Sequence, residues 1–134
     1  MALPNGAGGY QLGDGNLSEL TIGYLATPQT ATATATLTAA QVTSGMLVAN
    51  PSATAAVYTL PTSAAIDAII TSAKVGSTFV LRLVNIGTSS GTVILVLGTG
   101  MTDGGNALVA VAITSSAVFT FRKTADAAYT VYRG

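Results

Sequence analysis

The sequence predicts a mainly β fold, an antiparallel β-sandwich or barrel of jelly-roll type, with one short helix and an extended N-terminal arm. Short runs of apolar and β-branched residues recur along the chain, and glycine, serine, threonine and Asn-Pro turns separate them. No alternation of strands with helical patterns is present, which favours antiparallel pairing. The 134 residues suit one domain, expected at residues 32–134 behind an arm of residues 1–31.

The first 31 residues are rich in glycine, which favours turns and extended backbone. Apolar side chains nevertheless recur there more often than in a plain linker. Two arrangements remain open: the arm docks on a neighbouring subunit or partner, or it folds back over its own domain. The residues expected to bind a partner are Leu3, Tyr10, Leu12, Leu17, Leu20, Ile22 and Tyr24.

Residues 30–38 alternate threonine with alanine, which fits a strand or a low-complexity spacer. Within residues 78–85, Phe79, Leu81 and Leu83 face one way, while Val80 and Val84 flank the single polar Arg82 on the other. A second face with one polar residue in three is expected to be mostly covered. The strands predicted from apolar runs are Leu37–Val42, Met46–Ala49, Val57–Leu60, Thr78–Asn85, Thr92–Leu97, Leu108–Ile113, Val118–Arg122 and Tyr129–Tyr132.

The predicted helix spans residues 62–73. Thr62 or Ser63 follows a proline and supplies the N-cap. Ile66, Ile69 and Ile70 recur at helical spacing and form its apolar stripe. A glycine lies just beyond the expected end.

The composition excludes several classes of function. The chain has ten charged residues, five of each sign, and neither cysteine nor histidine. Without cysteine there is no disulfide, no thiolate nucleophile and no zinc site of the usual kind. Without histidine the commonest general acid/base is missing. Five basic residues and zero net charge argue against nucleic acid as a partner. No apolar run approaches the roughly 20 residues of a membrane span.

No motif in the sequence has all the residues of a catalytic or cofactor-binding site. Residues 93–105, VILVLGTGMTDGG, begin like a dinucleotide fingerprint, but the third glycine is one position late and no helical pattern follows. Residues 98–105 are therefore predicted to be a hairpin loop. Asp67, Asp103 and Asp126 lie far apart in sequence, and nothing supports a carboxylate dyad or Ser/Lys centre of a hydrolase. No catalytic, cofactor-binding or metal-binding residue is predicted. Three basic residues near the C-terminus, Arg122, Lys123 and Arg133, could face nucleic acid or an acidic partner, but the nearby Asp126 favours a solvated hairpin end.

Four segments of residues 37–134 follow one another in a recognisable order: LTAAQVTSGMLVANPSA, YTLPTSAAIDAI, KVGSTFVLRLVNIGTSSGTVILVLGTGMT and TFRKTADAAYTVYR. In this order the chain resembles the small virion structural proteins of tailed bacteriophages. The opening GAGGYQLGDGN is similar to the arms of capsid-associated members. The motifs are turn-and-strand patterns, and domains of this kind also occur in tail and fibre proteins.

The resemblance implies a capsid decoration, or cement, protein that needs no cofactor. Its implied partners are the major capsid protein and further copies of itself, most simply in a homotrimer, with no nucleic acid and no membrane. Its implied location is the capsid surface of the virion, after synthesis in the host cytoplasm, because the N-terminus lacks the basic and apolar regions of a signal peptide. The alternative is an adhesive or receptor-binding knob of a tail or head fibre.

Overall fold

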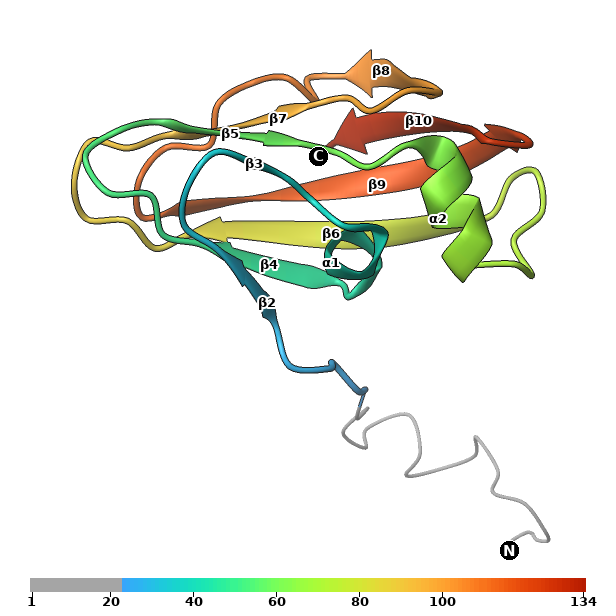
Figure 1. Ribbon diagram of the computed structural model, residues 1–134, viewed down its shortest axis with the longest axis horizontal. Helices are drawn as coiled ribbons and strands as arrows, with labels where there is room; N and C mark the ends of the chain where they lie inside the picture. Colours follow the sequence, from blue (N-terminus) through green and yellow to red (C-terminus); the bar gives the residue numbers. More distant parts are fainter. Residues whose placement is uncertain (1–22) are drawn as a thin grey trace, which may run out of the picture.

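Two β-sheets and two short helices enclose one hydrophobic core in the computed structural model, which describes residues 23–134 (Figure 1). The core side chains come from both sheets and both helices. In chain order the elements are β2 (Gln29–Ala31), β3 (Ala35–Thr36), α1 (Ala39–Thr43), β4 (Met46–Ala49), β5 (Ala56–Thr59), α2 (Ser63–Ile69), β6 (Thr78–Asn85), β7 (Val93–Val96), β8 (Met101–Gly105), β9 (Ser115–Ala125) and β10 (Ala128–Arg133).

The strand pairing contradicts the predicted antiparallel sandwich or barrel of jelly-roll type. The larger sheet has the order β2-β4-β6-β9-β10-β8, and its pairs β2–β4, β4–β6 and β8–β10 are parallel. Only the pairs β6–β9 and β9–β10 are antiparallel. The smaller sheet, β3-β5-β7, is parallel throughout. The fold is therefore a mixed one, and residues 23–134 contain two short helices where one was predicted.

The physical reason for the parallel pairs is that the chain alternates between the sheets. From β2 to β7, each strand of the larger sheet is followed by a strand of the smaller one. The next strand of the larger sheet then runs in the same direction as the one before it. Strand pattern alone predicts where strands lie, but it carries no information about which sheet receives each of them.

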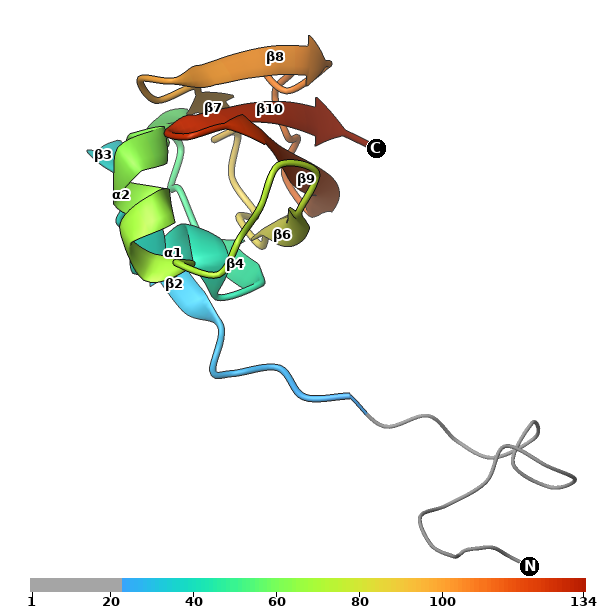
Figure 2. The ribbon, with the colours of Figure 1, turned by 90° about the vertical axis from the view of Figure 1, so that its right-hand side faces the viewer.

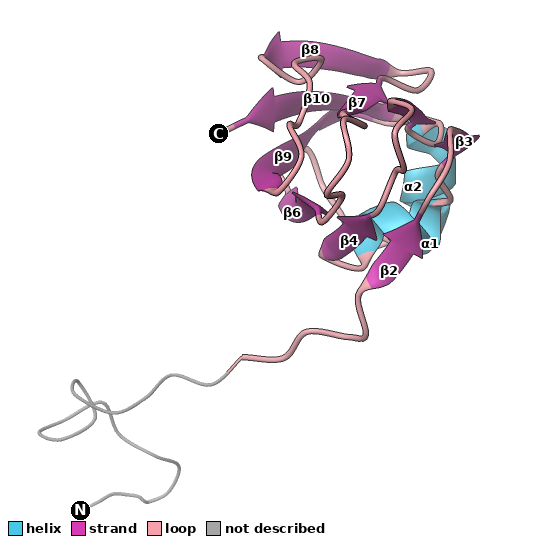
Figure 3. Cartoon of the chain, turned by 90° about the vertical axis from the view of Figure 1, so that its left-hand side faces the viewer, coloured by secondary structure: helices cyan, strands magenta, loops and turns pink. Residues whose placement is uncertain are grey.

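The helices cover one side of the core, between the two sheets. Figures 2 and 3 look along the strands from opposite ends and show α1 and α2 between the β2–β4 edge of the larger sheet and β3 of the smaller one. The outward sides of both sheets have no helix packed on them in these views. This leaves the two sheet exteriors as the broad surfaces of the described residues.

The predicted strand at residues 37–42 is wrong, because this segment contains α1. Thr38 is the N-cap: its hydroxyl accepts a hydrogen bond from the Gln41 backbone N–H, and the Gln41 side chain accepts one from the Thr38 N–H. This reciprocal capping box satisfies backbone donors that would otherwise lack partners at the helix start. Ala39 and Val42 then point into the core. The Thr-x-x-Gln capping box therefore favours a helix here more strongly than the short apolar run favours a strand.

The predicted helix is confirmed at its start and is shorter than expected. Thr62 caps α2 by accepting a hydrogen bond from the Ala65 N–H. The helix ends at Ile69, four residues before the predicted end. Ile66 is fully buried, whereas Ile69 is 49% exposed. The apolar stripe therefore covers a single turn.

The predicted strand Thr78–Asn85 is confirmed with the same bounds as β6, as is Met46–Ala49 as β4. Four further predicted strands overlap β5, β7, β9 and β10. Leu108–Ile113 is not a strand: only Val111 forms a β-bridge, to Val93. Residues 98–105, predicted to be a loop, contain β8.

The alternating segment at residues 30–38 contributes to both sheets. Gln29–Ala31 pair with β4, and Ala35–Thr36 pair with β5. The strand interpretation of this segment is therefore correct in part, with the crossing between sheets in its middle. Pairing also begins at Gln29, inside the range expected for the arm.

Candidate functional site

A polar cluster joins α2 to the β9–β10 hairpin. The Asp67 carboxylate accepts hydrogen bonds from Lys123 Nζ at 2.8 Å, from the Tyr129 hydroxyl at 2.7 Å and from the Ala127 backbone N–H at 2.7 Å. Lys123 lies on the inward side of β9 and is only 6% exposed. Asp126, fully exposed, approaches Lys123 to 3.9 Å. The buried ammonium therefore depends on Asp67 as its close counter-ion.

The electrostatics of this cluster fix its protonation state. The hydrogen bond from Lys123, reinforced by those from Tyr129 and Ala127, lowers the pKa of Asp67 to about 2. Burial, together with the neighbouring Asp67 carboxylate, raises the pKa of Tyr129 well above its usual value. At neutral pH the carboxylate is charged and the phenol is neutral. Neither group is near the pKa that general acid–base catalysis uses, so the arrangement is suited to holding α2 against the hairpin.

Asp67 should make the stability of the protein fall in acid. Because its folded-state pKa of about 2 is below the unfolded value of 3.8, its contribution is present above about pH 5 and is lost as the pH falls towards 2. The full contribution is about 2 kcal/mol. Urea unfolding of the wild type and of Asp67→Asn at pH 7, 4 and 2.5 measures it. The two proteins should converge in acid, and a stability difference that does not change with pH would contradict this assignment.

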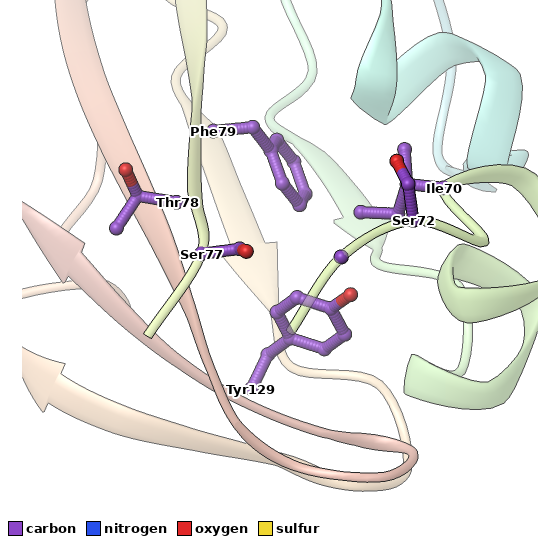
Figure 4. A pocket seen from close by; sticks show the side chains of 7 residues that line it. Ile70, Ser72, Ser77, Thr78, Phe79 and Tyr129 are labelled. Atoms are coloured by element: carbon purple, nitrogen blue, oxygen red, sulfur yellow. The ribbon is translucent and has the colours of Figure 1, made fainter. Parts of the chain in front are cut away.

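A pocket of about 210 Å³ lies beside this cluster (Figure 4). Phe79 and Tyr129 project into it from β6 and β10, across from Ile70 and Ser72. The Phe79 ring also stacks on Phe121, with 4.6 Å between ring centroids. No charged side chain lines the pocket. It offers aromatic faces and hydroxyl groups, but no group that could move a proton near neutral pH. The lining residues are Ile70, Ser72, Ala73, Ser77, Thr78, Phe79 and Tyr129.

Neither helix of the described residues has the length and apolar character needed to cross a membrane. Within residues 23–134, no group of three acidic side chains lies close enough together to hold a metal ion. Asp103, in β8, accepts hydrogen bonds from the backbone N–H groups of Gly105 at the end of the strand and of Ala107 just beyond it. Asp103 therefore lies on a different element from Asp67, which is in α2.

The outward side of the larger sheet, here called the outer sheet face, is mostly apolar or β-branched. Alternation along β4, β6, β9 and β10 turns one set of side chains into the core and the other set outwards. Arg82 and Arg122 are the two charged side chains of the outward set. The outer sheet face consists of Met46, Val48, Thr78, Val80, Arg82, Val84, Ser116, Val118, Thr120, Arg122, Thr130 and Tyr132.

The expectation for residues 78–85 is confirmed in its alternation. Leu81 and Leu83 are fully buried, Arg82 is exposed, and Val80 and Val84 are half-buried. Within the described residues, no helix or strand packs over this outward side. The smaller sheet repeats the pattern, with Val57, Thr59, Ile94 and Val96 on its outward side.

Of the residues expected to bind a partner, Tyr24 lies within the described part of the chain. Its side chain is 93% exposed, and the neighbouring Leu25 is 47% exposed. Residues 23–28 are all exposed, form no strand and run away from the two sheets (Figures 1 and 2). The other expected residues lie outside the described residues: Leu3, Tyr10, Leu12, Leu17, Leu20 and Ile22.

The three basic residues near the C-terminus do not form one solvated group. Lys123 is buried against Asp67, whereas Arg122 is exposed on the outer sheet face. Arg133 donates hydrogen bonds to the carbonyl oxygens of Val109 and Ala110. The sequence contained a signal for the buried lysine. Lys123 follows Phe119 and Phe121 at every second position of β9, so the alternation of side chains places it on the same inward side.

Comparison of the chain with family models, curated protein sequences and solved structures gives no significant match.

Proposed function

We propose that the chain is a non-enzymatic virion structural protein, which binds the outer surface of a phage capsid and stabilises the shell as a decoration protein. The proposal starts from the resemblance of residues 37–134 to small virion proteins of tailed phages. The observation that carries it further is the exterior of the two sheets. No other element of residues 23–134 packs on these broad surfaces, which consist mostly of valine, isoleucine, methionine and threonine and hold two charged side chains.

Such surfaces suit a protein that works within an assembly. The centres of protein–protein interfaces are depleted of charge, and contiguous apolar patches on a free protein mark interaction sites. Only 7% of the residues in this chain are charged, against about 25% in ordinary domains. A decoration protein acts by binding the assembled shell in preference to its separated subunits, which stabilises the shell by mass action.

The fully exposed Tyr24 adds a second contact region. A tyrosine that is 93% exposed, next to a half-exposed leucine, offers aromatic and apolar surface to a partner. In the fibre-knob alternative, exposed aromatic side chains or loops such as residues 98–105 would bind the receptor. That segment contains β8, which pairs with β10 through Tyr129–Tyr132. On that side the backbone groups of β8 are hydrogen-bonded within the sheet, so the segment is not a free loop.

The test is to locate the protein in purified virions and to measure what its loss does. Antibody labelling should mark the capsid, and virions made without the protein should release their DNA at a lower temperature than wild-type virions. Adding the purified protein back should restore the release temperature, which controls for damage during assembly. Labelling confined to the tail, or unchanged heat stability of virions without the protein, would rule out the decoration role. Binding of the detached protein to host cells would instead favour the knob.

A further inference from the structure

The first 22 residues and the rest of the chain have opposite charges. Residues 1–22 contain two acidic side chains, Asp14 and Glu19, and no basic one, a formal charge of −2. Residues 23–134 contain five basic against three acidic side chains, a formal charge of +2. The zero net charge of the whole protein therefore conceals two complementary parts.

Two of the five basic side chains of the described part lie on the outer sheet face. Lys123 is paired with Asp67, and Arg133 is held by two backbone carbonyl groups. Lys74 is exposed in the loop between α2 and β6. Arg82 and Arg122 are exposed on the outer sheet face, and neither has a carboxylate within ion-pair distance among residues 23–134. This surface combines apolar side chains with two cations that have no acidic neighbour there.

We propose that residues 12–22 of one copy of the chain bind across the outer sheet face of a second copy, with Asp14 and Glu19 facing Arg82 and Arg122. The segment matches the surface in character, because it is acidic and also carries Leu17 among its apolar side chains. Apolar contact supplies burial, and the charge pairs fix the register.

The spacing of the charges agrees with this pairing. Arg82 is opposite Val118 in the register of β6 and β9, and Arg122 is opposite Thr78. The two arginines are thus four strand positions apart, about 13 Å along the strands. In an extended chain, Asp14 and Glu19 are at most about 18 Å apart, a difference that the long arginine side chains can span. Five positions place the two acids on opposite sides of a regular strand, so the pairing also requires a turn of the backbone, which the glycine at position 15 can make. Leu17 then lies between the two acids, over the row of side chains that contains Thr120.

The direction of residues 23–28, which run away from their own sheets, favours a second copy as the receiving partner. This stretch leaves its own domain from β2, an edge strand, and each of its residues is exposed. Twenty-two residues reach at most about 75 Å when extended, while six strands are about 25 Å wide. The segment can therefore reach a neighbouring sheet. The contact is between copies of the chain and does not depend on the capsid proposal.

Disulfide trapping in the full-length protein tests the contact, because the natural chain has no cysteine. The trapping variant combines Leu17→Cys with Thr120→Cys. The matched control combines Leu17→Cys with Ala64→Cys on the exposed side of α2, away from the outer sheet face. After mild oxidation, we expect at least about fivefold more disulfide-linked dimer from the trapping variant, as measured on non-reducing gels.

Charge reversal supplies the second arm of the test. Arg82→Glu with Arg122→Glu, added to the trapping variant, should reduce dimer formation about fivefold or more. Adding Asp14→Lys with Glu19→Lys should restore it, which distinguishes lost complementarity from misfolding. Equal trapping at Thr120 and Ala64, a disulfide formed only within one chain, or no effect of charge reversal would each overturn the proposal.

Discussion

Replacing Gly98 by alanine is expected to destabilise the protein by about 3 kcal/mol or more. A Cβ atom at this position would overlap the carbonyl oxygen of Pro61 and lie 2.6 Å from that of Leu60. Both neighbours are backbone, and Leu60 is fixed by a hydrogen bond from its N–H to the Val96 carbonyl oxygen. The strain therefore cannot be relieved by rotating a side chain. The loss is measured as the change in urea-unfolding free energy.

Alanine substitutions at two other glycines provide comparisons for this prediction. Gly105→Ala is the matched control, since a Cβ there meets nothing within 4 Å, and its effect should be below about 0.5 kcal/mol. Gly104→Ala should have an intermediate effect, because its Cβ would meet the ring of Tyr132, which is 41% exposed and can move. If Gly98→Ala were as mild as Gly105→Ala, the close backbone approach between residues 60–61 and 98 would be incorrect.

The second large effect is expected from Asp67→Ala, with a loss of about 3 kcal/mol. This change leaves the Lys123 ammonium buried without its counter-ion at 2.8 Å and removes the acceptor of the Tyr129 hydroxyl. Lys123→Met should cost less, about 1–2 kcal/mol, because Asp67 is partly exposed and keeps the donors from Tyr129 and Ala127. Denaturant unfolding at pH 7 compares the variants.

The neighbouring Asp126 provides the control for this prediction. Asp126→Asn removes a carboxylate 3.9 Å from the same lysine, but that carboxylate is fully exposed, so a change below about 0.5 kcal/mol is expected. The double variant Asp67→Leu with Lys123→Met should recover much of the loss, since an apolar pair needs no buried counter-ion. Equal losses from Asp67→Ala and Asp126→Asn would show that the lysine is not buried as described.

Local signals in the sequence predicted much of the strand content, because alternation and turn residues act within a few positions. Residues 78–85 show this best, with the correct bounds and the correct inward residues. The strand Met46–Ala49 was likewise predicted with its bounds. The N-cap was predicted at Thr62 or Ser63 for the same reason, since an N-cap concerns only the first turn of a helix, and the structure has it at Thr62.

Pairing direction and the polar cluster could not be predicted in this way. Parallel pairing of β4 with β6 depends on the intervening β5 joining the other sheet, which is a long-range choice. Asp67 and Lys123 are 56 residues apart, and only the folded chain brings them together. The outer sheet face was foreseen in part, through the outward alternation of residues 80–84, but its two isolated arginines emerge only from the register of β6 and β9.

Because the chain alternates between the two sheets, local opening of one sheet should also loosen the other. β2 cannot leave the edge of the larger sheet for long without loosening β3, which follows after three residues and pairs in the smaller sheet. The amide groups of Asn50 and Leu37 donate hydrogen bonds to Ala31 and Thr59, one on each sheet. They should therefore exchange their hydrogens with solvent at similar free energies of opening, as members of one cooperative unit that spans both sheets.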